Sequence, residues 1–261
     1  MHGCSDVERR LDVKFCETYD ALMLRLFSLC LLTLYCANAL ALSNDEVIAG
    51  AGQMYRQRML ALEQRHALDD DVIFLARVKK ITRTLVLQAN TDYSAFADWN
   101  WEVHTSSDAE EMAYCMAGGK IFISQSKVQD LNLNDAELAM LLSHEMQHAL
   151  LLHNLKEYVE AIRLFPTWKN RPFAQLEDAV DNDATLIQAL AEFNFKQEIE
   201  ADMEGLKFAW RAGWKATDLA KFFKKLGASN TMKNFDSVSH PAPARRWKAA
   251  RDLAGTLDAH L

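Results

Sequence analysis

The chain has 261 residues, of which 50% are hydrophobic, and a formal net charge of -7 at pH 7. This much apolar material can fill one hydrophobic core, and four prolines, nine glycines and no low-complexity run leave no obvious linker. The negative charge and the lack of a clustered Lys and Arg stripe exclude nucleic acid as the expected partner. We therefore expect a single domain over residues 42–261.

The N-terminal part of the sequence predicts export. Residues 22–42 are nearly all apolar, with Arg25 near the start and a run of small residues, 37–41, at the end. This order is typical of a secretory signal, so we assign residues 23–41 to a signal peptide and residues 1–22 to an extension upstream of the expected start at Met23. The protein would then be periplasmic or secreted. The alternative is a membrane anchor over residues 22–42, because about twenty apolar residues can span a bilayer.

The positions of the cysteines agree with export. Cys4, Cys16, Cys30 and Cys36 precede the predicted cleavage site, which leaves Cys115 as the only thiol of the mature chain. No disulfide can form within that chain, so its core and a metal would have to stabilise it.

Beyond the signal, the spacing of apolar residues predicts helices around a small sheet. A helix capped by Ser43 or Asn44 runs to about residue 62, and another opens at residues 69–71 and runs to about residue 85. Three strands are expected around residues 99–103, 112–116 and 121–123, with Gly118 and Gly119 as a hairpin turn between the last two. The predicted fold class is α+β, mainly helical, with a three-stranded sheet.

The next helix carries the most informative motif, His144-Glu145-Met146-Gln147-His148. A cap at Asn134 and apolar residues on both sides of the motif predict one continuous helix that reaches residue 152. Residues four apart share a helix face, so His144 and His148 can bind one cation while Glu145 reaches a water molecule on it. Imidazole suits zinc, and zinc beside a carboxylate base is the chemistry of a peptidase.

A catalytic zinc of this kind needs a third protein ligand and one open position. Glu198, Glu200 and Asp202 lie in a later helical stretch, and each offers a carboxylate. Glu198 and Asp202 are four apart and share a face, so one can bind the metal while the other holds the far nitrogen of a ligand histidine. Spacing alone does not choose among the three carboxylates.

Together these motifs resemble a zinc metallopeptidase family that includes BepA, HtpX and the CaaX prenyl protease. The E-x-x-A-D motif of the family is matched by residues 198–202, which implies Glu198 as the third ligand and Asp202 as the partner of a ligand histidine. The family's His-Pro segment followed by Arg is matched by residues 240–246, which implies His240 in the active site and Arg246 supporting the ligands from behind. The resemblance covers residues 43–250 and is strongest to soluble periplasmic BepA-type members, which implies a minimal zincin-like protease domain with the sheet beside the motif helix.

The resemblance also implies where a substrate binds. The family has an edge strand ending in Pro-Gly-Gly and then a strand reading I-x-V, matched by residues 113–123. An extended substrate would pair with the edge formed by Tyr114, Cys115, Met116 and Ala117. Ala117 replaces the family's proline, and Met112 stands where the family often has asparagine, so this edge departs from the family pattern while the metal site does not.

The implied function is that of an endopeptidase with one Zn²⁺ per chain, which hydrolyses unfolded or misassembled cell-envelope proteins in protein quality control. Glu145 would act as general base on a zinc-bound water, and His240 would either stabilise the oxyanion or block the open zinc position. The alternative function is a chaperone-like binder of the same proteins with latent or absent catalysis. The segment 164–173 is expected to be an ordinary packed loop between helices. The alternative is that three of its aromatic residues cover the cleft or contact a membrane peripherally: Phe165, Trp168 and Phe173.

Overall fold

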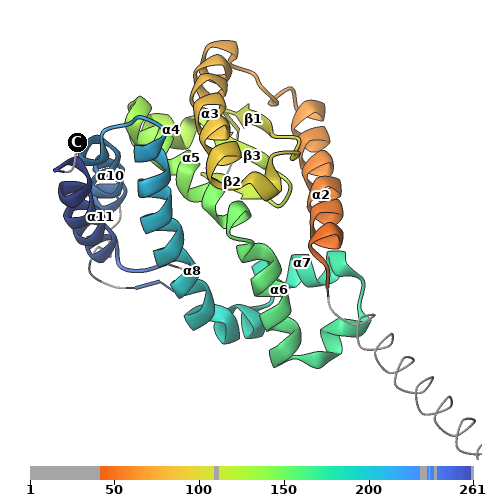
Figure 1. Ribbon diagram of the computed structural model, residues 1–261. Helices are drawn as coiled ribbons and strands as arrows, with labels where there is room; N and C mark the ends of the chain where they lie inside the picture. The colour runs from red at the N-terminus through yellow and green to blue at the C-terminus, as the bar shows by residue number, and fades with distance from the viewer. Residues whose placement is uncertain (1–41, 109–111, 230–233, 235, 238–239, 260–261) are drawn as a thin grey trace, which may run out of the picture. The chain divides into compact units, whose positions relative to one another are not determined.

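Helices dominate the part of the chain that the computed structural model describes, which is residues 42–108, 112–229, 234, 236–237 and 240–259 (Figure 1). The elements in chain order are α2 (Asn44–Gln64), α3 (Val72–Asp92), η1 (Ser94–Phe96), β1 (Glu102–Ser106), β2 (Ala113–Met116), β3 (Lys120–Ser124), α4 (Gln125–Asp130), α5 (Asp135–Leu150), α6 (His153–Leu164), η2 (Pro166–Asn170), α7 (Phe173–Asn182), α8 (Ala184–Arg211), α9 (Ala216–Leu219), α10 (Lys221–Ser229) and α11 (Pro243–Asp258). The predicted signal peptide and upstream extension lie outside the described residues. The expected class, mainly helical with a small three-stranded sheet, is confirmed.

Side-chain caps fix where the main helices begin. Ser43 and Glu46 form a capping box at the start of α2, and Asn134 and Glu137 form another at the start of α5. The Asp71 carboxylate accepts hydrogen bonds from two backbone amides of α3. These side chains satisfy amide groups that have no partner inside the helix, so the predicted starts of all three helices are confirmed.

The sheet has the strand order β1-β3-β2, with β1 parallel to β3 and β2 antiparallel to it. The turn between β2 and β3 contains Gly118 and Gly119, both with a φ of 79°, which a residue with a Cβ rarely adopts. The predicted hairpin is confirmed. The first strand lies later in the chain than predicted. β1 begins at Glu102, whereas Trp99 and Trp101 precede the strand and pack against the core.

The core is built around α5. Its Leu138, Met140, Leu142 and Met146 side chains are fully buried, and the helix packs against β2, α3, α8 and α10. Figure 1 shows α5 between the sheet and α8. The motif helix therefore has neighbours on every side that could contribute to a site.

The predicted continuous helix through residue 152 is wrong. α5 ends at Leu150, and Leu152 adopts a left-handed φ of 57° before α6 starts at His153. The chain changes direction there, because a left-handed residue cannot continue a right-handed helix. This break brings a further histidine back toward the motif.

The segment after α6 packs as part of the fold. η2 and the start of α7 occupy most of residues 164–173, and Phe165, Trp168 and Phe173 lie partly buried against a second apolar cluster that includes Tyr158 and Leu176. Phe173 also packs edge to face on Tyr158, with ring centroids 5.1 Å apart. Within the described residues, no helix combines the length and apolar character that crossing a membrane would require.

Candidate active site

Two helices far apart in the sequence carry the predicted metal ligands. His144 and His148 lie one turn apart on α5, and Glu198 and Asp202 lie one turn apart on α8. The two helices pack directly against each other. Each pair shares a helix face because residues four apart are neighbours on the helix surface, so the packing brings the two faces together.

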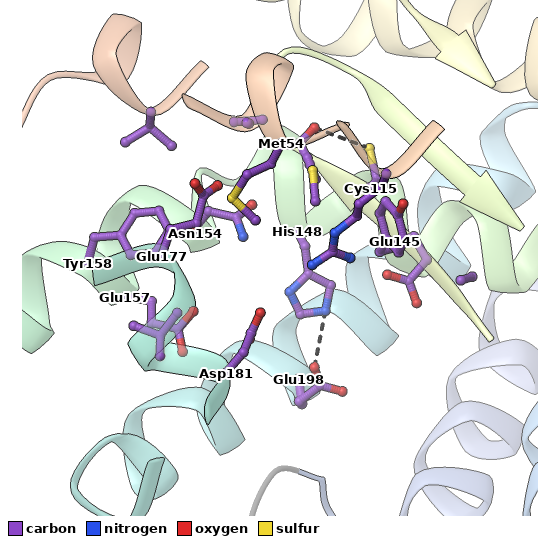
Figure 2. A pocket seen from close by; sticks show the side chains of 18 of the residues that line it. Met54, Cys115, Glu145, His148, Asn154, Glu157, Tyr158, Glu177, Asp181 and Glu198 are labelled. Atoms are coloured by element: carbon purple, nitrogen blue, oxygen red, sulfur yellow. Dashed lines mark hydrogen bonds and ion pairs between the residues drawn. The ribbon is translucent and has the colours of Figure 1, made fainter. Parts of the chain in front are cut away.

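The donor atoms of three side chains converge at this contact. The Nε2 atoms of His144 and His148 are 3.3 Å apart, and the carboxylate of Glu198 lies 3.2 Å from His148 Nε2 and 3.6 Å from His144 Nε2. Figure 2 shows His148 and Glu198 facing each other across the cavity. Among the described residues this is the one group of three His, Cys, Asp or Glu side chains whose ligand atoms all lie within 4.8 Å of one another.

The chemistry of this group fits a metal ion. Two imidazoles and one carboxylate are a donor set typical of catalytic zinc. The Oε2 atom of Glu198 is buried and has no hydrogen-bond partner, as expected for an oxygen that needs a cation. Burial raises the pKa of Glu198, but the charges of His144 and His148 and a hydrogen bond from His148 outweigh burial and keep that pKa below its ordinary value.

Asp202 and Arg246 orient His144 through its Nδ1 atom, the ring nitrogen that does not face the other two predicted ligands. Asp202 Oδ1 lies 3.0 Å from His144 Nδ1, and the guanidinium of Arg246 binds both oxygens of Asp202 at 2.7 and 2.6 Å. Burial raises the pKa of Asp202, yet the charge of Arg246 and the bond to His144 lower it further than burial raises it. An ionised Asp202 keeps the proton of His144 on Nδ1, which leaves Nε2 free to bind a metal.

Glu145 lies one position round the helix from the two histidines. It lines both cavities that border the predicted ligands. Burial raises the pKa of Glu145, while the neighbouring His144 and His148 partly oppose this rise. A carboxylate with a raised pKa accepts a proton more readily, as a general base working near neutral pH must.

His153 and Glu200 support the second ligand histidine. His153 Nδ1 lies 3.1 Å from His148 Nδ1, and His153 Nε2 lies 3.2 Å from Glu200 Oε2. Burial lowers the pKa of His153 to about 3, so its ring is neutral. Its Nδ1 atom can accept a hydrogen bond from the Nδ1–H of His148, while its Nε2–H donates one to Glu200. Sequence reasoning missed this pair, because residues 148 and 153 would not share a face on the continuous helix it assumed.

His240 approaches the site from the loop before α11. Its Nε2 atom lies 3.3 Å from Glu198 Oε2, and about half of its side chain (49%) is exposed. Ser237 fixes the loop, because its Oγ accepts a hydrogen bond from the backbone N–H of His240. Asp236 accepts a further bond from the backbone of Ala242. Neither polar contact was predicted from the sequence.

The predicted substrate edge borders the same site. β2 is an edge strand of the sheet, and Tyr114, Cys115 and Met116 belong to it and line a cavity of about 630 Å³ that also contains His144, Glu145 and His148. Ala117 lines the cavity too, but it lies just past the strand, in the turn, because the two glycines after it reverse the chain. The Cys115 thiol is buried, which raises its pKa well above the usual value.

Gly205 is a further residue that sequence reasoning missed. A Cβ atom at this position would lie 3.0 Å from the backbone N of His144 and 3.1 Å from its Cα. Glycine therefore lets α8 approach α5 closely enough for Glu198 and Asp202 to meet the histidines. A glycine inside a predicted helix, three residues after Asp202, was the available signal.

Comparison with known proteins places these residues in a family context. The sequence model of peptidase family M48 matches residues 75–254. The chain is 29% identical over 196 residues to mitochondrial metalloendopeptidase OMA1 of Arabidopsis thaliana, a match that covers 71% of this chain and 37% of the relative. It is 24% identical over 233 residues to the beta-barrel assembly-enhancing protease of Yersinia pestis, covering 84% of this chain and 46% of the relative. A third match, to OMA1 of Saccharomyces cerevisiae, is 25% identical and covers 64% of this chain and 51% of the relative. The chain thus spans about half or less of the length of these relatives.

Proposed function

This chain belongs to peptidase family M48, and we propose that it is a zinc-dependent endopeptidase that hydrolyses unfolded or misassembled proteins of the cell envelope. Membership of the family, two relatives named metalloendopeptidase and one named protease support this activity. The identity of the metal, the substrates and the compartment are the proposed part. The observation that carries the proposal is the convergence of His144, His148 and Glu198 beside Glu145, in a cavity bordered by an edge strand.

The side chains divide the reaction among themselves. A zinc ion bound by His144, His148 and Glu198 would lower the pKa of a water molecule and polarise the scissile carbonyl group. Glu145 takes the proton of the attacking water and delivers it to the nitrogen of the leaving amine. Asp202 keeps His144 in the tautomer that binds the metal, and Arg246 keeps Asp202 ionised.

The edge of β2 favours extended, unfolded substrates. A peptide that adds to this edge as a strand is held by backbone hydrogen bonds, which are available to any sequence but only to a chain that is not already folded. This mode of binding suits quality control. The name of the Yersinia pestis relative, which refers to β-barrel assembly, supports the cell envelope as the place of action.

Glu145→Gln tests the enzymatic proposal. The variant retains the shape of the side chain but cannot accept the proton, so cleavage of an unfolded protein should stop while bound zinc stays at one ion per chain. Glu63→Gln, at an exposed position of α2, is the matched control and should keep full activity. Cleavage is followed by mass spectrometry, with the folded form of the same substrate expected to resist. Undiminished cleavage by Glu145→Gln would refute the assigned role.

The second candidate function is a chaperone-like binder that uses the same groove without cleavage. The position of His240, whose Nε2 atom lies 3.3 Å from Glu198 Oε2, favours this function because the imidazole could block the open position of a bound metal. The same assay separates the two functions. A binder would capture unfolded protein equally well in the original chain and in Glu145→Gln, and neither would cut it.

We propose a periplasmic or secreted location for the mature protein. Signal-peptide cleavage would place its N-terminus near residue 40 or 42. The apolar segment and the small residues 37–41 support it, and they lie outside the described residues. N-terminal sequencing of the protein from the envelope fraction tests the proposal. An intact Met23 end recovered from washed membranes would favour the anchored alternative.

A further inference from the structure

One end of the active-site cavity is acidic. Glu157 on α6 and Glu177 and Asp181 on α7 line it, and in Figure 2 they lie on the other side of His148 from Glu145. Arg58 of α2 is the one Lys or Arg among the described residues that line this cavity. This end of the cavity therefore has three acidic groups and one basic group.

Glu177 has a carboxylate oxygen that could accept a hydrogen bond from a ligand. Its residue is only 5% exposed, and its Oε2 atom has no hydrogen-bond partner. Leaving a buried carboxylate oxygen unsatisfied is costly, and proteins usually avoid it unless a ligand completes the site. The Oδ1 atom of Asn154, which lines the same wall, is also buried without a partner.

Burial raises the pKa of two of these carboxyl groups. It raises the pKa of Glu157 to about 7 and that of Glu177 to about 7, although a hydrogen bond from Asn194 and the charge of Arg58 respectively oppose the rise. A cationic group entering this end of the cavity would restore the ionised forms that burial disfavours.

A metal ion is not the cation that fits here. Among the described residues, only His144, His148 and Glu198 bring ligand atoms close enough to share one ion. The acidic wall also contains apolar side chains from three elements, Met54, Tyr158 and Val180 among them. A long aliphatic stem with a charged end matches such a lining, because the stem lies on the apolar atoms while the end reaches the carboxylates.

We propose that this end of the cavity is a specificity pocket for a lysine or arginine side chain of the substrate, with Glu177 as its principal acceptor. The proposal rests on the proposed peptidase function and adds a substrate class to it. The pocket is continuous with the metal ligands and with the β2 edge, so the basic residue lies close to the bond that is cut.

A second cavity at the same site has a different character. It measures about 660 Å³, shares Ala113, His144, Glu145 and His240 with the first, and is lined by apolar side chains that include Leu141, Phe222 and Leu226. The preference for a basic residue is therefore expected at one substrate position only. An apolar residue suits the position that enters the second cavity.

Matched peptides test the pocket. Peptides that differ only by Lys, Met or Glu are compared, with the changed residue placed in turn at each position flanking the cleaved bond. Met has a similar length to Lys without its charge. At one position we expect kcat/KM for Lys to exceed that for Met by about tenfold or more, since a hydrogen bond between charged groups is stronger than the contacts of an uncharged thioether. Glu should be the poorest residue there.

The variant Glu177→Gln should reduce the ratio of kcat/KM for the Lys and Met peptides to about one. Glu192→Gln is the control, because Glu192 pairs with Lys196 on the exposed face of α8 and lies outside the cavity lining; it should leave the ratio unchanged. Equal cleavage of the Lys and Met peptides by the original chain, or a ratio that Glu177→Gln does not alter, would overturn the proposal.

Failure of the pocket and failure of the peptidase function give different results. If no peptide is cut, the function fails, and the pocket is then judged from the affinity of Glu145→Gln for the fluorescently labelled Lys and Met peptides. Tighter binding of the Lys peptide supports the pocket, and equal binding refutes it. If peptides are cut without a preference for Lys, the function stands and the pocket does not.

Discussion

Gly205 of α8 lies directly against the backbone of His144 in α5, where an added Cβ would come within 3.0 Å of the His144 nitrogen. This contact sets the distance between the helix that carries the two histidines and the helix that carries Glu198. The proposed metal site therefore depends on a residue that has no side chain.

Gly205→Ala should destabilise the protein and weaken metal binding together. Overpacking at a tight contact costs about 1–3 kcal/mol, which exceeds the gain of up to about 1 kcal/mol from the better helix propensity of alanine. Urea unfolding measures the stability, and competition with a chelator measures zinc affinity. Gly255→Ala on α11 is the matched control, because a Cβ there meets no atom within 4 Å, and it should stabilise the protein. Similar stability changes in the two variants would contradict a tight α5–α8 contact.

His153→Leu should lower zinc affinity by about 10- to 100-fold, the usual cost of removing a residue that orients a metal ligand. The variant fills the buried position with an apolar side chain but leaves His148 Nδ1 without its partner. Glu200→Gln should have a smaller effect in the same direction, since Glu200 acts through His153. Spacing left Glu200 open as a metal ligand, and the contact with His153 gives it a supporting role instead.

The control for this pair is Glu204→Gln, because Glu204 lies on the same helix and pairs with Lys207. Zinc affinity should not change in that variant. If His153→Leu and Glu204→Gln bind zinc equally well, the link from His148 through His153 to Glu200 does not support the site.

His240→Ala should change peptidase activity without loss of zinc, because His240 contacts the ligand Glu198 but stands at the edge of the cavity. A rise in basal cleavage would identify His240 as a latch over the open metal position. A fall of about 10²–10³ in kcat would identify it as a donor to the oxyanion. Ser237→Ala, which removes the acceptor that holds the His240 backbone, should shift activity in the same direction by less. Unchanged activity in His240→Ala would remove it from the mechanism.

The contribution of Glu157 and Glu177 to stability should fall as the pH rises from about 5 to about 8. The folded state raises the pKa of both groups to about 7, so it retains protons that the unfolded chain releases near its ordinary pKa of 4.5. Each group then contributes on the order of 1–3 kcal/mol less to the free energy of unfolding at the upper end of this window, while His153, whose pKa burial lowers to about 3, contributes in the opposite sense below about pH 6.5. Urea unfolding of metal-free protein at several pH values measures the slope. Glu177→Gln should flatten it, and parallel curves for the variant and the original chain would contradict the assignment.

The sequence by itself determined the parts of this protein that depend on neighbours within one helix turn or one hairpin. The spacing of His144 and His148, the shared face of Glu198 and Asp202, and the caps at Ser43, Asp71 and Asn134 all follow from local backbone geometry. Periodicity and the glycine pair likewise predicted a mainly helical fold with a small sheet. Local rules fix such features whatever surrounds them.

Only the tertiary structure decided which groups from distant segments meet. Spacing could not choose among Glu198, Glu200 and Asp202; the packing of α8 on α5 turns Glu198 toward both histidines, while Glu200 reaches His153 instead. The left-handed turn at Leu152 that returns His153 to the site, and the acidic wall formed by α6 and α7, have no signature in local spacing. The physical reason is that these contacts arise from close packing between elements, which depends on side chains far apart in the chain and not on the period of any one of them.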